Sequence, residues 1–129
     1  MLATSHLFSS FSVDDIDAAR AFYGKTLGLT VGEGQQPGII EVHAAGHDAV
    51  TVYPKPDHTP ATFTVLNFVV DDMNATIDAL VAAGITMEQY HTADMQTDAR
   101  GVISGGGMRI AWFKDPAGNI LSVIANGNA

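Results

Sequence analysis

Glu41 and His43 are of the residue types that bind metals, and in this 129-residue chain their spacing is the first feature that suggests a metal site. They stand two residues apart in GIIEVHA (38–44), an apolar run typical of a strand, so both side chains point to the same face. Such a pair suits two ligands of a divalent metal, although an exposed hydrogen-bonded pair on a sheet face is the more ordinary arrangement. His6 and His91 are further candidates for a metal site or for contact with a ligand.

Two pairs of neighbouring aspartates, Asp14–Asp15 and Asp71–Asp72, have the composition of an acid–base dyad. Each pair stands directly before a segment in which apolar residues recur at helical spacing. A carboxylate at that place accepts hydrogen bonds from the free N–H groups of the first helical turn and stabilises the helix dipole. We therefore expect Asp14 and Asp71 to be helix N-caps.

Composition and charge exclude several classes of function. The chain contains no cysteine, which excludes thiolate metal sites, cysteine nucleophiles and disulfides. Its formal charge of −8 repels phosphate, so nucleic acid is not expected as a partner. No apolar run reaches the length of a membrane span, and the first residues lack the basic region of a signal peptide. We therefore expect no membrane contact and a cytoplasmic location.

The sequence contains a repeat, and each copy includes the elements that position these residues. FSVDDIDAAR (11–20) and FVVDDMNATI (68–77) are identical at five of ten positions. Each copy joins a strand-like run to a helix that ends at a glycine, and further short strand-like runs follow. The expected strands cover 5–13, 29–34, 38–44, 48–54, 61–70, 85–91, 100–104, 108–114 and 119–125.

This order predicts one α+β domain over residues 1–129, made of two βαβββ repeats, about 4–54 and about 62–126, with a proline-rich linker at 54–61. The two repeats are expected to form a curved mixed sheet around a trough, with the helices on the convex side. GGG at 105–107 lies between two expected strands and precedes no helix, which predicts a hairpin turn rather than a phosphate-binding loop.

VDDIDAARAFYGKTLGLTV (13–31) and FKDPAGNILSVI (113–124) carry a resemblance to the vicinal oxygen chelate superfamily, which includes glyoxalase I, bleomycin-resistance proteins and extradiol dioxygenases. The resemblance implies a ligand site in the trough. In many members that site is a divalent metal held by His, Gln or Glu, one from each of four strands. In this chain the corresponding positions fall on Phe8, Thr51, Val65 and Ser122.

None of these four residues suits a metal. Phenylalanine and valine have no electron pair to donate, and neutral hydroxyl groups are poor ligands for zinc, iron or manganese. We therefore expect no metal and no other cofactor. Strand alternation places the same positions, with polar neighbours, on the trough side, as an apolar pocket with a few polar groups. Trp112, the only tryptophan, is either a core residue or an aromatic wall of this pocket.

The leading prediction is thus a small-molecule binding protein that sequesters an apolar or aromatic compound and forms a homodimer, as the resemblance implies. Its expected ligand-binding residues are His6, Phe8, Thr51, Tyr53, Phe63, Val65, Asn67, His91, Trp112 and Ser122. The alternative is a metal-dependent lyase, isomerase or dioxygenase whose divalent metal is held at a non-standard site by His6, Glu41, His43 and His91. A third interpretation is a subunit or regulatory domain whose trough is empty and whose exposed sheet edge mediates association with another chain.

Overall fold

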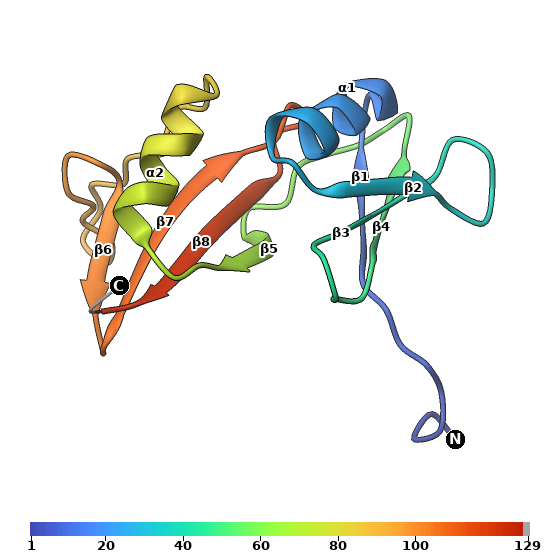
Figure 1. The fold of residues 1–129 in the computed structure, drawn as a ribbon, viewed down its shortest axis with the longest axis horizontal. Helices are drawn as coiled ribbons and strands as arrows, with labels where there is room; N and C mark the ends of the chain where they lie inside the picture. Colours follow the sequence, from blue (N-terminus) through green and yellow to red (C-terminus); the bar gives the residue numbers. More distant parts are fainter. Residues whose placement is uncertain (128–129) are drawn as a thin grey trace. The chain divides into compact units, whose positions relative to one another are not determined.

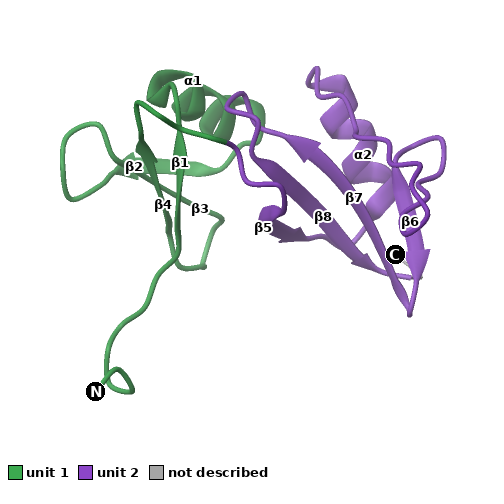
Figure 2. Ribbon diagram, turned by 180° about the vertical axis from the view of Figure 1, so that it is seen from behind, with its two compact units in different colours: residues 1–59 green, residues 60–129 purple. Residues whose placement is uncertain are grey.

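The structure, a computed structural model, describes residues 1–127. The chain divides into two compact units, Met1–Thr59 and Pro60–Ala129, shown in different colours in Figure 2. The boundary falls inside the segment 54–61, where three prolines suggested a linker. Within the described residues, no helix is long and apolar enough to cross a bilayer.

Unit 1 is a four-stranded mixed sheet with one helical segment (Figure 1). The strands lie in the order β1-β4-β3-β2, with β1 parallel to β4 and the other pairs antiparallel. The helix α1 continues directly into a π-helical turn, η1, which the helical spacing did not predict. The elements are β1 (Ser10–Val13), α1 (Ile16–Ala21), η1 (Phe22–Thr26), β2 (Thr30–Glu33), β3 (Ile40–His43) and β4 (Val50–Pro54).

Unit 2 has the same topology. Its strands lie in the order β5-β8-β7-β6, again with the first strand parallel to the last. The two βαβββ repeats and the α+β class predicted from the sequence are therefore confirmed, as is the hairpin turn, where Gly106 and Gly107 have φ of 61° and 78°. The elements are β5 (Thr64–Val69), α2 (Met73–Ala82), β6 (Val102–Gly105), β7 (Met108–Lys114) and β8 (Ile120–Asn126).

Each sheet buries one face under its helix. Alternate residues along the strands point to that face and exclude water, because successive side chains of a strand point to opposite sides. In unit 1 the buried set is Phe11, Val13, Ala19, Phe22, Tyr23, Ile40, Val42 and Val52. In unit 2 it includes Met73, Ile77, Val102, Ala111, Phe113, Leu121, Val123 and Ala125. The opposite side of each sheet is called its helix-free face below.

The helix caps lie one residue later than predicted. Asp15 Oδ1 accepts hydrogen bonds from the backbone N of Asp17 and Ala18, so Asp15, and not Asp14, is the N-cap of α1. Asp72 Oδ1 accepts from Ala75 N in the same way, so Asp72 replaces the predicted Asp71. The second aspartate of each pair thus caps a helix, and the acid–base interpretation is not needed to explain it.

The predicted strand 5–13 is wrong over its first half, because β1 begins only at Ser10. Its neighbour β4 begins at Val50, and the pairing between the two strands starts at Ser10 with Thr51. Residues 5–9 therefore have no ladder of partners and form no strand. Leu7, which a strand over 5–13 would place on the same side as the buried Phe11 and Val13, is 84% exposed.

The predicted strand 85–91 is also wrong. Glu88 N donates one backbone hydrogen bond of 2.9 Å to Trp112 O on β7, but β6 takes the ladder positions along the rest of that edge. His91 forms only an isolated bridge with Gln96. Gly101 lies so close to this segment that an added Cβ would be 2.7 Å from Glu88 O, and its φ of 85° favours glycine as well.

Candidate functional site

A cavity of about 360 Å³ lies on the helix-free face of unit 1. This volume is within the range of pockets that hold small molecules. Three segments build it: the residues before β1, the loop between β2 and β3, and the neighbouring parts of β3 and β4. The lining residues are His6, Phe8, Gly34, Gln35, Gln36, Ile39, Glu41, Asp48, Ala49 and Thr51.

The floor of the cavity follows from strand register. Thr51 on β4 pairs with Ser10 on one side and with Glu41 on the other, and Glu41 pairs in turn with Gly32. Directly paired residues on adjacent strands have neighbouring side chains on the same face. Because Val52 and Ile40 point to the helix, Thr51 and Glu41 must point to the helix-free face, where both are half-buried.

The apolar wall comes from a segment outside the sheet. Phe8 and His6 precede β1, so they reach the cavity without the strand that the sequence predicted for them. Phe8 is 64% exposed, which leaves an aromatic ring available at the mouth of the cavity. Tyr53 and His43 lie on the same face of the sheet, beyond the cavity lining.

The helix-free face of unit 2 carries a second row of predicted residues. Trp112 on β7 pairs with Ser122 on β8, and Ser122 pairs with Asn67 on β5. Ser122 Oγ lies 2.5 Å from Asn67 Oδ1, and Ser122 is only 1% exposed. The register therefore assigns Trp112 to the helix-free face, whereas alternation along the sequence did not decide which face Trp112 occupies.

The register of β5 shifts between Thr64 and Leu66, so Val65 does not take the place that alternation predicted. Thr64 takes it instead, since Trp112 Nε1 donates a hydrogen bond of 3.2 Å to Thr64 Oγ1. A bulge adds one residue to a strand, so the side chains on the two sides of the bulge alternate in opposite phase. Strict alternation along the sequence therefore predicts the wrong face for the residues before the bulge. Phe63, ahead of β5, is 68% exposed.

Tyr90 completes the aromatic cluster of this face. Its ring meets Trp112 edge-on, with the ring centres 5.6 Å apart and the planes at 86°. Burial, and then the nearby Glu88 carboxylate, raises the pKa of Tyr90 above its usual 10.0, and Lys114 lowers it in part. His91, the next residue, is exposed.

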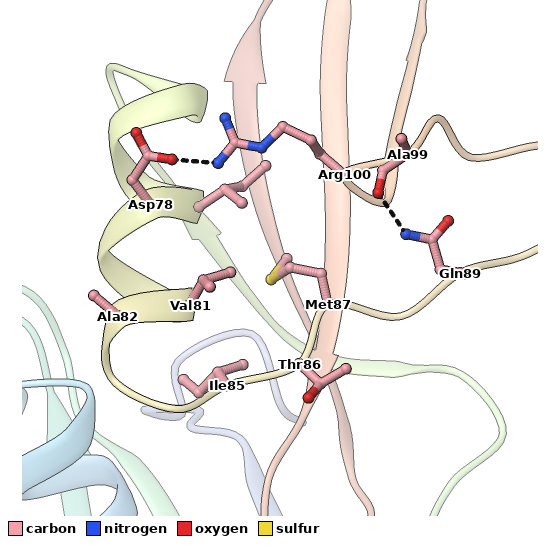
Figure 3. Close-up of a pocket in the computed structure, with 10 residues that line it drawn as sticks. Asp78, Val81, Ala82, Ile85, Thr86, Met87, Gln89, Ala99 and Arg100 are labelled. Carbon is pink, nitrogen blue, oxygen red and sulfur yellow. Dashed lines mark hydrogen bonds and ion pairs between the residues drawn. The ribbon is translucent and has the colours of Figure 1, made fainter.

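A larger and more open cavity, of about 600 Å³, lies beside α2 in unit 2 (Figure 3). Its apolar side chains include Val81 and Met87, and Figure 3 shows an ion pair between Asp78 on the helix and Arg100 at one end. The Arg100 Nη2 to Asp78 Oδ1 distance is 2.5 Å. None of the residues predicted to bind ligand contributes to this cavity.

The chemistry of the four family positions does not fit a divalent metal. Phe8 and Val65 offer no donor atom, and the Ser122 hydroxyl is buried against Asn67. The alternative set fits no better as a group, because no three His, Asp or Glu side chains gather around a common point within residues 1–127. The cavity in unit 1 does bring His6 and Glu41 of that set to one lining.

Several residues that line the unit 1 cavity were not predicted from the sequence. Gln35, Gln36, Ile39, Asp48 and Ala49 flank β3 and β4 at their ends and contribute to the lining. No periodicity marks such positions, because loop residues are placed by the turns around them. Asp48 follows a glycine turn, and that turn was the one local signal that a side chain could come close to the sheet surface.

Comparison with known proteins supports the resemblance. Residues 5–123 match the family model described as Glyoxalase/Bleomycin resistance protein/Dioxygenase superfamily. No curated protein sequence matches the chain.

Solved structures of similar fold cover almost the whole chain. TnmS3, an antibiotic binding protein from Streptomyces sp. CB03234, is 25% identical with a TM-score of 0.71, over 98% of this chain and 99% of that one. A glyoxalase/bleomycin resistance protein from the same strain is 25% identical with a TM-score of 0.63, over 91% and 98%. A putative glyoxalase family protein from Bacillus anthracis shares the fold at 19% identity, with a TM-score of 0.70 over 98% and 99%. The chain belongs to the glyoxalase/bleomycin resistance protein/dioxygenase superfamily.

Proposed function

We propose that this protein binds a small apolar or aromatic molecule in the cavity of unit 1, without a metal and without chemical conversion. One observation carries the proposal. The cavity is built around Phe8 and Thr51, two positions where the family resemblance implies metal ligands, and these side chains line it as an apolar ring and a hydroxyl. A cavity of that kind holds a molecule by burial of apolar surface and orients it by a few hydrogen bonds.

The similarity to TnmS3, whose description is an antibiotic binding protein, supports binding rather than catalysis. The polar groups around the cavity, chiefly the Gln35 and Gln36 amides and the Thr51 hydroxyl, can hydrogen bond to a ligand. The proposal includes a homodimer in the cytoplasm with no nucleic-acid or membrane partner. Light scattering at micromolar concentration tests the dimer, and a monomer mass would contradict it.

A metal-dependent lyase, isomerase or dioxygenase is the second candidate. It is favoured by the presence of His6 and Glu41, two residues of the alternative ligand set, in the lining of the same cavity. Imidazole and carboxylate groups are good ligands for divalent metals, so these two side chains suit a metal better than the four family positions do. No third His, Asp or Glu joins them around a common point within residues 1–127.

Two measurements on untagged protein purified without chelator separate the candidates. Elemental mass spectrometry gives the metal content, and fluorescence titration with the neutral probe dansylamide, with and without EDTA, gives the effect of metal on binding. The proposal predicts far less than one metal per chain and the same saturable affinity in both titrations. Near-stoichiometric zinc, iron, manganese or nickel, with binding lost in EDTA, would overturn it in favour of the enzyme.

A further inference from the structure

The charged side chains around the unit 1 cavity are acidic. Glu41 and Asp48 are both in its lining, and no lysine or arginine is. Glu41 lies on the sheet floor and Asp48 just before β4, so the two carboxylates belong to different segments that meet at one cavity. A cavity lined by two carboxylates and one histidine, with no lysine or arginine, favours cationic over anionic ligands.

Neither carboxylate has a partner in the part of the chain that the structure describes. The ion pairs there use other acids: Arg20 with Glu33, Lys55 with Asp57, Arg100 with Asp78 and Lys114 with Glu88. These pairs occupy four of the six lysine and arginine side chains of the protein. The cavity carboxylates therefore keep their full capacity to accept hydrogen bonds from a ligand.

The surroundings of Glu41 leave room for such a ligand. On the β2 side its paired residue is Gly32, which has no side chain, and even an added Cβ there would meet nothing within 4 Å. On the β4 side its paired residue is Thr51, a small side chain. The half-buried Glu41 carboxylate is partly removed from water, so a cation beside it gains more than it would at a fully exposed carboxylate.

We infer that the ligand of this cavity is an organic cation, an aromatic or apolar body that carries an amine or guanidine group. This inference rests on the proposed binding function and names its ligand class. The body packs against Phe8 and Ile39, and the cationic group forms charge-assisted hydrogen bonds with Glu41 and Asp48. An anion of the same shape is repelled by both carboxylates and by the net charge of −8.

Three probes that share one fluorophore test the inference: dansylcadaverine is cationic, dansylamide neutral and dansylglycine anionic. Fluorescence titration of the intact protein at physiological ionic strength should rank them in that order, with the cation bound about tenfold or more tightly than the neutral probe, as one charge-assisted contact allows. Glu41→Gln, which keeps the size of the side chain, should remove most of this preference. Asp94→Asn removes an exposed carboxylate outside the cavity and should leave the preference intact.

The outcomes distinguish a failure of the cationic ligand class from a failure of small-molecule binding itself. Equal affinity for the cationic and neutral probes, or a preference that Glu41→Gln leaves unchanged, would overturn the cationic ligand class while leaving small-molecule binding in place. Saturable binding of none of the three probes, or binding that persists when Thr51→Trp fills the cavity, would overturn both. Circular dichroism melting of each variant verifies that the protein measured is folded.

Discussion

Trp112 Nε1 donates a hydrogen bond of 3.2 Å to Thr64 Oγ1 across the intervening strand β8. The contact joins β7 to the edge strand β5 and fixes the indole on the helix-free face of unit 2. It depends on the register shift in β5, because without that shift Thr64 would point to the helix. The only tryptophan of the chain thus reports on this face by its fluorescence.

Thr64→Val keeps the shape of the side chain and removes the acceptor for Trp112. We expect the free energy of unfolding to fall by about 1 kcal/mol, because a partly buried indole N–H loses its hydrogen bond. Urea denaturation followed by tryptophan fluorescence measures this change. Thr62→Val, at an exposed position before β5, is the matched control, and equal stability of the two variants would contradict the role assigned to Thr64.

Thr51→Trp fills the unit 1 cavity with a large ring while changing a half-exposed residue. Saturable binding of dansylamide should disappear, since the probe and the indole compete for the same space. Thr59→Trp adds the same side chain at an exposed position outside the cavity and should bind the probe as the original protein does. Retained binding in Thr51→Trp would locate the ligand elsewhere.

Ser122→Glu restores a carboxylate at a position where the family resemblance implies a metal ligand. Ser122 is 1% exposed, so the new charge is buried without a partner and should lower the free energy of unfolding by about 3–5 kcal/mol. Ser104→Glu, on the exposed part of β6, should change stability by less than about 0.5 kcal/mol. If Ser122→Glu unfolds at the same urea concentration as Ser104→Glu, position 122 tolerates a charge, which would contradict the burial of Ser122 against Asn67.

Tyr90→Phe tests the packing of Tyr90 against Trp112 by its effect on the pH titration of the protein. Burial and the Glu88 carboxylate raise the pKa of Tyr90, so the difference in tyrosinate absorbance between the original protein and the variant should titrate above pH 10.0. The raised pKa contributes stability that is fully present below the unfolded pKa of 10.0 and is lost as pH rises through the folded pKa. The variant should lose less stability over that range. A difference titration centred at or below pH 10.0 would contradict the packing of Tyr90 on Trp112.

The repeat pattern was enough to predict the βαβββ order, because helix and strand periodicities differ and each aspartate pair marks a helix start. Strand alternation also predicted correctly that Thr51 lies opposite Val52 and the helix. Both signals are local, and both concern residues inside regular elements.

The wrong predictions concern strand pairing, strand register and loop positions, which local sequence patterns do not determine. Residues 5–9 and 85–91 have strand-like sequences but lack strand partners, and pairing is a property of the whole sheet. The faces near Val65 changed with a register shift that no residue type announced. The carboxylate of Asp48 reaches the cavity from a turn, so its association with Glu41 became visible only in three dimensions.

The most direct test of the account is the location of bound ligand on the protein in the presence of EDTA. Amide chemical shifts of ¹⁵N-labelled protein, followed during titration with dansylcadaverine, report this location residue by residue. The account predicts saturable shifts at Phe8, Gln35, Ile39, Glu41 and Thr51, with α2 and Arg100 unaffected. Shifts confined to the α2 cavity of Figure 3, or shifts at the unit 1 cavity that appear only when EDTA is left out, would contradict it.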